Sequence, residues 1–175
     1  MTGMRIFRAA VAPSLSESSP DHEMAYAPMS PTTQAGIGKL VEAGIGEGNV
    51  VKALFSAPGF SLIYAWFKPH FPLARHSHDT DCLYYIVSGS LRLGTEPLAA
   101  GDGFFLPAGV PYTYAIGADG LEILEFRHTS HFEFRAAGGS HAYWDKAAAT
   151  IIANRGAWQR LVLPRAAVDS SKVGK

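Results

Sequence analysis

The chain has 175 residues, and its 15 Lys and Arg side chains balance its 15 Asp and Glu side chains, so the formal net charge is zero. A chain of this length fits one domain with extensions. Binding to nucleic acids requires an excess of positive charge, and attachment to anionic lipid requires a run of basic residues. Because the sequence has neither, we expect no nucleic acid and no membrane among its partners.

The sequence also bears on the compartment. Cys82 is the single cysteine, so an internal disulfide framework is excluded, which is compatible with a reducing compartment. The apolar stretch Ala9–Ala12 is too short for the core of a secretory signal. No apolar run approaches the roughly 20 residues that a membrane-spanning helix needs. We therefore expect a cytoplasmic protein.

Residues 1–34 mix Pro, Ser and small residues without sustained periodicity. This composition predicts an N-terminal arm rather than part of a core. Two interpretations stay open. The arm is partly disordered, which we prefer, or it docks on a partner subunit through Tyr26 and Met29.

Residues 35–138 are expected to form the main domain, because short runs of β-branched and aromatic residues recur from about residue 49 to residue 136. The predicted strands are Val50–Phe55, Phe60–Phe67, Leu83–Val87, Ser90–Leu93, Gly103–Leu106, Tyr112–Ile116, Glu122–Arg127 and His131–Phe134. Turn signals such as Ser88-Gly89 and residues 117–120 separate them. Many short strands joined by such turns predict an antiparallel sandwich or barrel. Several runs are apolar on both faces, so we expect cover from a second subunit or from a terminal segment.

In residues 139–175 the pattern of apolar residues changes from strand-like to helical. Apolar residues at mostly helical spacing predict a helix over about Ala142–Val162, with Ser140 as its N-cap. Gly156 is expected to interrupt or end the first helical stretch. The remainder is expected to be a C-terminal tail.

The tripeptide His76-Ser77-His78 is the strongest chemical signal in the chain. Alternate side chains of an extended strand share one face, which places the two imidazoles about 6–7 Å apart on the same side. Two neutral imidazoles that converge from one strand can bind a divalent metal. The sequence therefore predicts His76 and His78 as metal ligands facing the barrel interior.

The stretch from Pro69 to Ile116 resembles both sequence motifs of the cupin superfamily, of the conserved-barrel type. The first motif, G-x5-H-x-H-x3-E-x6-G, matches at His76, His78 and Gly89, while His70 replaces the first Gly and Cys82 replaces the Glu. The second motif is G-x5-P-x-G-x2-H-x3-N. It keeps its glycines and proline, and the residues at its His and Asn positions are Tyr112 and Ile116.

The resemblance implies an all-β, cupin-type double-stranded β-helix, or jelly-roll barrel, with the N-terminal arm and the C-terminal helix added. It also implies a homodimer and a divalent metal (Fe, Zn, Mn or Ni) in the barrel mouth, held in the family by three His and one Glu. Here the expected ligands are His76, His78 and Cys82, with Tyr112 as a further candidate. Asp81 becomes a candidate if a bulge rotates the strand. In the alternative interpretation, Cys82 packs as a small hydrophobe and the other side chains line a pocket.

Three functional hypotheses follow. The first is a metal-dependent cupin that binds a small organic molecule and acts as a dioxygenase-like oxygenase or an isomerase/lyase on a small organic acid or aromatic compound. In it, Tyr112 or Tyr114 donates a proton or orients the substrate. The second is a non-catalytic cupin that has lost the metal site and binds or senses a metabolite. The third is an assembly protein whose apolar strands serve only to form a dimer.

Overall fold

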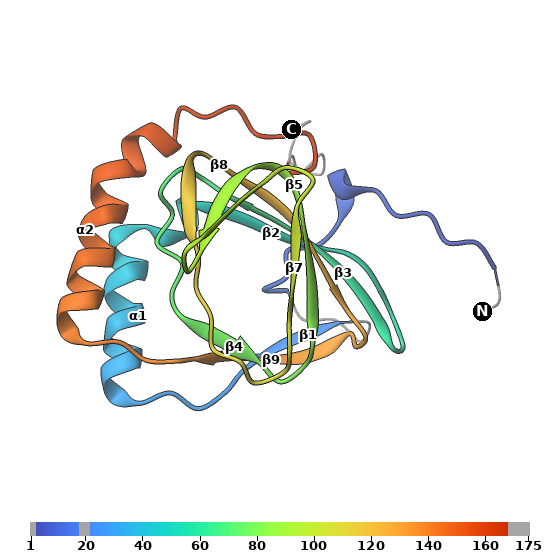
Figure 1. The fold of residues 1–175 in the computed structure, drawn as a ribbon, viewed down its shortest axis with the longest axis horizontal. Helices are drawn as coiled ribbons and strands as arrows, with labels where there is room; N and C mark the ends of the chain where they lie inside the picture. The colour runs from blue at the N-terminus through green and yellow to red at the C-terminus, as the bar shows by residue number, and fades with distance from the viewer. Residues whose placement is uncertain (1–2, 18–21, 168–175) are drawn as a thin grey trace.

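The computed structural model describes residues 3–17 and 22–167 and shows a barrel of two β-sheets with two helices against one side (Figure 1). The strands are β1 (Glu23–Tyr26), β2 (Asn49–Ala57), β3 (Phe60–Phe67), β4 (His76–His78), β5 (Cys82–Leu93), β6 (Glu96–Ala99), β7 (Gly103–Leu106), β8 (Ala115–Arg127) and β9 (His131–Ala136). The helices are α1 (Pro31–Ala43) and α2 (His141–Trp158), with single 3-10 turns at Ala9–Val11 and Ile45–Glu47. None of the helices in the described part of the chain is long and apolar enough to cross a membrane.

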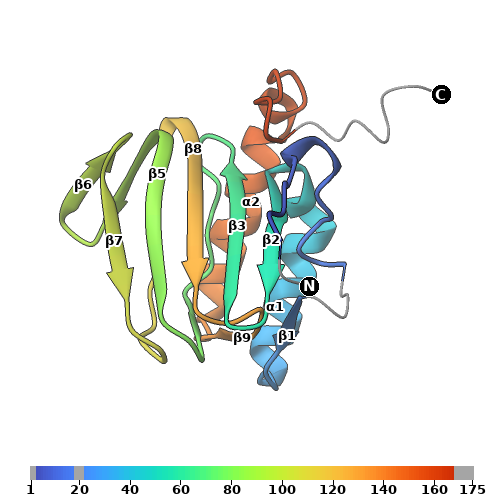
Figure 2. The same cartoon turned by 90° about the vertical axis from the view of Figure 1, so that its right-hand side faces the viewer.

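The larger sheet has the order β2-β3-β8-β5-β6, with β7 also paired to β5, and all of its pairs are antiparallel. This sheet faces the viewer in Figure 2. The smaller sheet has the order β1-β9-β4, in which β1 runs parallel and β4 antiparallel to β9. The two sheets enclose an interior to which both motifs contribute. The predicted all-β jelly-roll barrel with a C-terminal helix is therefore confirmed.

Two predicted turns are wrong, because their glycines lie inside long strands. β5 continues through Ser88-Gly89, and β8 continues through residues 117–120. The pairing between these strands shifts register on either side of Gly89, which has φ of +77°. A Cβ at Gly89 would lie 2.0 Å from the carbonyl oxygen of Gly120. The glycines therefore permit β-bulges and a close backbone approach, rather than a chain reversal.

The N-terminal segment is more ordered than its composition predicts. Within the expected arm of residues 1–34, Glu23–Tyr26 forms β1 on the edge of this chain's own β9. The expected boundary between residues 34 and 35 falls inside α1, where the side chain of Ser30 accepts a hydrogen bond from the N–H of Thr33. Pro31 is the first residue of this helix, a position that favours proline, so here it starts a helix instead of interrupting one. Residues 18–21 of the expected arm lie outside the described residues.

The C-terminal helix starts as predicted but does not stop at Gly156. Ser140 caps α2 by accepting a hydrogen bond from the N–H of Tyr143, and the helix runs through Gly156, which is exposed, to Trp158. A single glycine at an exposed helical position costs only about 1 kcal/mol, which the packing of α2 outweighs. Trp144 packs so closely on α1 that a Cβ at Gly36 would lie 2.3 Å from its ring. The indole N–H of Trp158 donates to the carbonyl of Pro69 (2.9 Å) and so ties α2 to the barrel.

Candidate functional site

The two histidines of β4 are both buried and face the barrel interior, as the strand alternation predicts. Their ring centroids lie 5.1 Å apart. The ring of His76 stacks on Phe134 of the neighbouring strand β9, with centroids 4.6 Å apart and an interplanar angle of 17°. Backbone pairing with β9 and this stacking fix the direction of both imidazoles.

A chain of hydrogen bonds starts at His76 and sets its tautomer. Nδ1 of His76 lies 2.7 Å from the carbonyl oxygen of Ala74, so Nδ1 carries the proton and donates it. Nε2 of His76 is then an acceptor, and it accepts a hydrogen bond from the Tyr112 hydroxyl, whose oxygen lies 2.9 Å away. The hydroxyl of Tyr84 lies 2.5 Å from that of Tyr112 and is left as the donor between the two. The direction of donation is therefore Tyr84 to Tyr112 to His76 to the backbone.

Tyr112 reaches this position through a backbone bridge rather than through the strand predicted for Tyr112–Ile116. Its N–H donates to the carbonyl of His76 (2.8 Å), and its own carbonyl accepts from the N–H of His76 (2.9 Å). Strand β8 begins only at Ala115. The residue at the His position of the second motif thus lies directly beside the first histidine of the first motif.

His78 is held by one nitrogen and leaves the other without a protein partner. Its Nδ1 donates to the carbonyl of Glu133 (2.9 Å), and Nε2 makes no hydrogen bond within the described residues. Burial is the largest cause that lowers the pKa of His78 to about 3, and the neighbouring Arg127 and His76 contribute to the same shift. Burial also lowers the pKa of His76. Both imidazoles are therefore neutral at neutral pH.

Aromatic rings form a wall of the barrel interior beside these hydrogen bonds. Tyr84 stacks on Phe104 (4.5 Å between centroids, 11° between planes), and Tyr114 lies 6.1 Å from Tyr112 and 6.0 Å from Phe104. Burial raises the pKa of all three tyrosine hydroxyls, so they stay protonated and can donate hydrogen bonds. The two predicted catalytic tyrosines thus differ. Tyr112 is part of the hydrogen-bonded chain, whereas Tyr114 contributes its ring to the wall.

A buried ion pair in the interior was missed by the sequence analysis. Nη2 of Arg127 lies 2.7 Å from Oε2 of Glu125, and their side chains are 1% and 12% exposed. Both come from β8, where they continue the inward face that starts at Leu121 and Ile123. The outward positions Leu124 and Phe126 are apolar, so alternation did not reveal which face was inward. The only available signal for this ion pair was the presence of two opposite charges, Glu125 and Arg127, two residues apart in a strand that pairs on both edges.

Cys82 also faces the interior and is buried. Burial raises the pKa of its thiol to about 12, so the sulfur is a neutral thiol at neutral pH and not the thiolate that binds metals. Asp81 does not turn into the barrel. Its carboxylate accepts a hydrogen bond from the backbone N–H of Ala108 (2.8 Å) and so holds the second-motif loop. The bulge that would have made Asp81 a ligand is absent at this position.

The donor set of the predicted metal site does not fit a divalent cation in this arrangement. His76, His78 and Cys82 share the interior, but no group of three or more His, Cys, Asp or Glu in residues 3–17 and 22–167 could hold a metal ion. The ring nitrogen of His76 that would bind the metal accepts a hydrogen bond from the hydroxyl of Tyr112 instead. Metal binding by His76, His78 and Cys82 stays a prediction.

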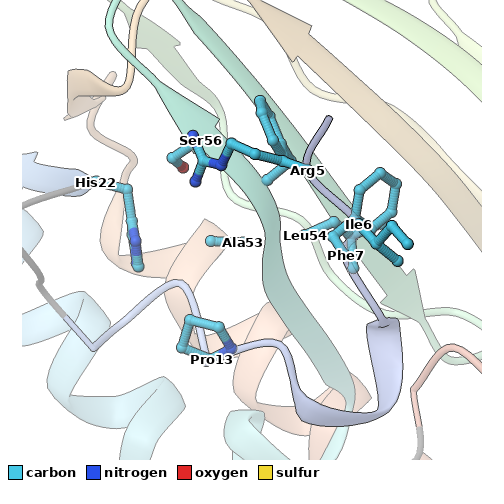
Figure 3. A pocket seen from close by; sticks show the side chains of 9 residues that line it. Arg5, Ile6, Phe7, Pro13, His22, Ala53, Leu54 and Ser56 are labelled. Carbon is cyan, nitrogen blue, oxygen red and sulfur yellow. The ribbon is translucent and has the colours of Figure 1, made fainter. Parts of the chain in front are cut away.

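Two cavities lie away from the hydrogen-bonded chain. One, of about 180 Å³, lies between the N-terminal segment and β2 (Figure 3) and is lined by Arg5, Ile6, Phe7, Pro13, His22, Ala53, Leu54, Phe55 and Ser56. The other, of about 410 Å³, is bounded by residues of β5, β6 and the start of β8, among them Leu91, Arg92 and Ile116. Neither cavity is lined by Tyr84, Tyr112 or His76.

No protein-family profile matches this sequence, and no curated protein does. Among solved structures, the polyketide cyclase RemF from Streptomyces resistomycificus is 19% identical, covers 61% of this chain and 82% of its own, and has a TM-score of 0.47. An RmlC-like cupin from Shewanella frigidimarina is 24% identical over 49% of this chain and 80% of its own, with a TM-score of 0.42. The oxalate decarboxylase of Bacillus subtilis is 18% identical over 47% of this chain, with a TM-score of 0.40, and the match spans 25% of that enzyme.

These similarities bear on the fold alone, and the fold follows from the molecule's own topology. The first motif lies on β4 and β5, and the second runs from the turn before β7 to the start of β8. The backbone bridge between His76 and Tyr112 brings the two motifs together inside the two-sheet barrel. The chain therefore has the cupin-type jelly-roll fold that its two motifs predict.

Proposed function

We propose that the barrel interior binds a small organic molecule without a resident metal, and that the hydrogen-bonded chain of Tyr84, Tyr112 and His76 recognises its polar group. One observation carries the proposal: Nε2 of His76 is the acceptor for Tyr112, so the residue at the position of the family's third His ligand is a hydrogen-bond donor. Of the hypotheses drawn from the sequence, the metabolite-binding barrel is the one that this arrangement favours.

The interior offers both kinds of hydrogen-bonding group to a ligand. Tyr112 can turn its hydroxyl from His76 to a ligand oxygen, while Nε2 of His78 can accept a hydrogen bond from a ligand N–H or O–H. The rings of Tyr84, Phe104 and Tyr114 supply flat apolar surface beside these groups. A small molecule with one polar end and an apolar or planar body suits such a wall. Because burial lowers the pKa of both imidazoles, they are weak proton acceptors, which favours recognition over general-base catalysis.

Ligand-dependent thermal stabilisation in the presence of a chelator tests this function. A panel of small carboxylic acids, amides and phenols is screened, and a ligand at 100 times its Kd adds about 2.7 kcal/mol of stability. We expect Tyr112→Phe to weaken the response, while Tyr26→Phe leaves it unchanged, because Tyr26 is 60% exposed on β1. A panel without a single stabilising compound would contradict the proposal.

Metal dependence is the second candidate, and the observation that favours it is the pair of inward imidazoles 5.1 Å apart. An oxygenase or isomerase/lyase of this kind would hold Fe, Zn, Mn or Ni on His76 and His78, and it would require Tyr112 to leave His76. Elemental analysis of protein purified without added metal decides between the two. Stoichiometric metal that disappears in His76→Ala would replace the metal-free proposal with this one.

We also propose that the protein pairs with a second copy through the outer face of β5 and β7. Leu83, Tyr85 and Val87 alternate on that face of β5, and Phe105 of β7 lies opposite Leu83. All four are exposed in the single chain, although they form adjoining apolar surface. By contrast, the outer face at Tyr64 and Trp66 is covered by Ala166 and Ala167 of the C-terminal segment. Sedimentation of a monomer at micromolar concentration would argue against the pairing.

A further inference from the structure

Arg127 has hydrogen-bond donors that the protein does not satisfy. Its side chain is 1% exposed, and only Nη2 has an acceptor, Oε2 of Glu125. The Nε–H and the N–H bonds of Nη1 are buried and have no partner among the described residues. A buried donor without an acceptor costs about 1–3 kcal/mol, and more when the group is charged. An acceptor from outside the chain would remove this cost.

The neighbours of Arg127 do not supply that acceptor. The guanidinium lies over the ring of Phe132, with Cζ 4.2 Å from the ring centroid. This cation–π contact covers one face, whereas N–H donors of a guanidinium point outward in its plane. Cys82, Tyr84 and Tyr112 are near enough to interact with Arg127 electrostatically, but each is a protonated neutral group. No neighbour of Arg127 among the described residues therefore accepts a hydrogen bond from Nε or Nη1.

The charges of the interior select the kind of ligand. Arg127 is the one cation among the inward-facing groups of the candidate site within the described residues, and Glu125 balances it through a single N–H group. A phosphate would bring about two negative charges at neutral pH against this one guanidinium. A carboxylate brings a single charge, and its oxygens form charge-assisted hydrogen bonds with guanidinium N–H groups. Of these two anions, a monoanionic carboxylate is thus the one that the site suits better.

We propose that the ligand of the barrel interior is a small carboxylic acid whose carboxylate accepts a hydrogen bond from a free N–H of Arg127, at Nε or at Nη1. This inference rests on the proposed function, because it names the class of molecule bound there and the residue that selects it. The remainder of the molecule lies against the aromatic wall, near the hydroxyl of Tyr112. Arg127 is then a specificity-determining residue of the site.

The test compares acids with their uncharged amides on the full chain. Propionate and benzoate are titrated beside propionamide and benzamide, with thermal stabilisation and the ¹⁵N–¹H signal of the Arg127 Nε group as readouts. We expect each acid to bind at least tenfold more tightly than its amide and to shift the Arg127 signal. Arg127→Lys keeps the charge but not the planar donors, so it should weaken benzoate binding at least tenfold.

A second variant keeps the inference falsifiable if Arg127→Lys does not fold. Glu125→Gln preserves the side-chain shape and leaves Arg127 in place while removing the competing negative charge, so it should bind benzoate several-fold more tightly than the unmodified protein. Equal binding of acids and amides, with the Arg127 signal unmoved, would overturn the carboxylate inference and leave the proposed function intact. Failure of every compound, charged or neutral, to bind would overturn the proposed function first.

Discussion

Replacing Tyr112 with Phe removes one hydroxyl but leaves two other buried groups without partners. Nε2 of His76 loses its donor, and the hydroxyl of Tyr84 loses its acceptor. The ring stays in place, so no cavity forms. Each unsatisfied buried group costs about 1–3 kcal/mol, so Tyr112→Phe should lower the free energy of unfolding by about 2–6 kcal/mol. That is a large part of the roughly 5–15 kcal/mol by which a domain is stable.

The direction of the hydrogen-bonded chain makes Tyr84→Phe much milder. In that variant Tyr112 still donates to His76, and only an acceptor position on its oxygen is vacated, so the expected cost is about 1 kcal/mol. In the double variant the hydroxyl of Tyr84 is no longer stranded. Its cost should therefore be smaller than the sum of the single costs, by about 1–3 kcal/mol.

Urea denaturation of the four proteins in this cycle measures these differences, provided that the dependence of the unfolding free energy on urea stays the same. Tyr26→Phe is the control, because the side chain of Tyr26 is exposed on β1. This variant should change stability by less than about 0.5 kcal/mol. Equal costs for Tyr112→Phe and Tyr84→Phe, with additive free energies, would refute the proposed order of donation.

Two further outcomes are expected. His78 is neutral when folded, with a pKa lowered to about 3 by burial and then by Arg127 and His76, so the unfolded chain binds more protons below pH 6.5. The contribution of His78 to stability should be constant above that pH and should fall by up to about 1.4 kcal/mol per pH unit below it. Denaturation between pH 7 and pH 4 should show a smaller loss of stability in His78→Gln than in the unmodified protein. An equal loss in the two proteins would contradict this. Gly89→Ala should cost about 2–4 kcal/mol, because its Cβ would meet the facing backbone at 2.0 Å, whereas Gly94→Ala, also at positive φ but with open space, should cost about 1 kcal/mol; equal melting temperatures of the two variants would contradict the steric argument.

Much of the barrel could be predicted because its strands are locally encoded. The runs Phe60–Phe67 and Gly103–Leu106 are strands with the predicted bounds, since β-branched and aromatic residues between turn residues form strands wherever they are placed. The helix from His141 was found from its period and its Ser140 cap. By contrast, α1 was missed because its pattern is dominated by small residues, and its packing depends on Trp144 from the other end of the chain.

The candidate site also has one part that the sequence predicts and another part that it does not. The inward direction of the His76 and His78 side chains could be predicted once their segment was taken to be a strand, because side chains two residues apart share a face. The role of Glu125 and Arg127 could not be predicted in this way, because both faces of β8 carry apolar residues and the choice of the inward face depends on the neighbouring strands.

Residue types and their spacing within short segments were enough to predict the strands, the barrel and the inward pair of imidazoles. What those imidazoles do emerged only from the folded chain. It brings Tyr112 to His76 across 36 residues and buries Arg127 with donors left over, and both results depend on backbone pairing between segments that are distant in the chain. Local patterns carry no record of such contacts, because a hydrogen bond between distant residues is fixed by the positions of the strands that present them.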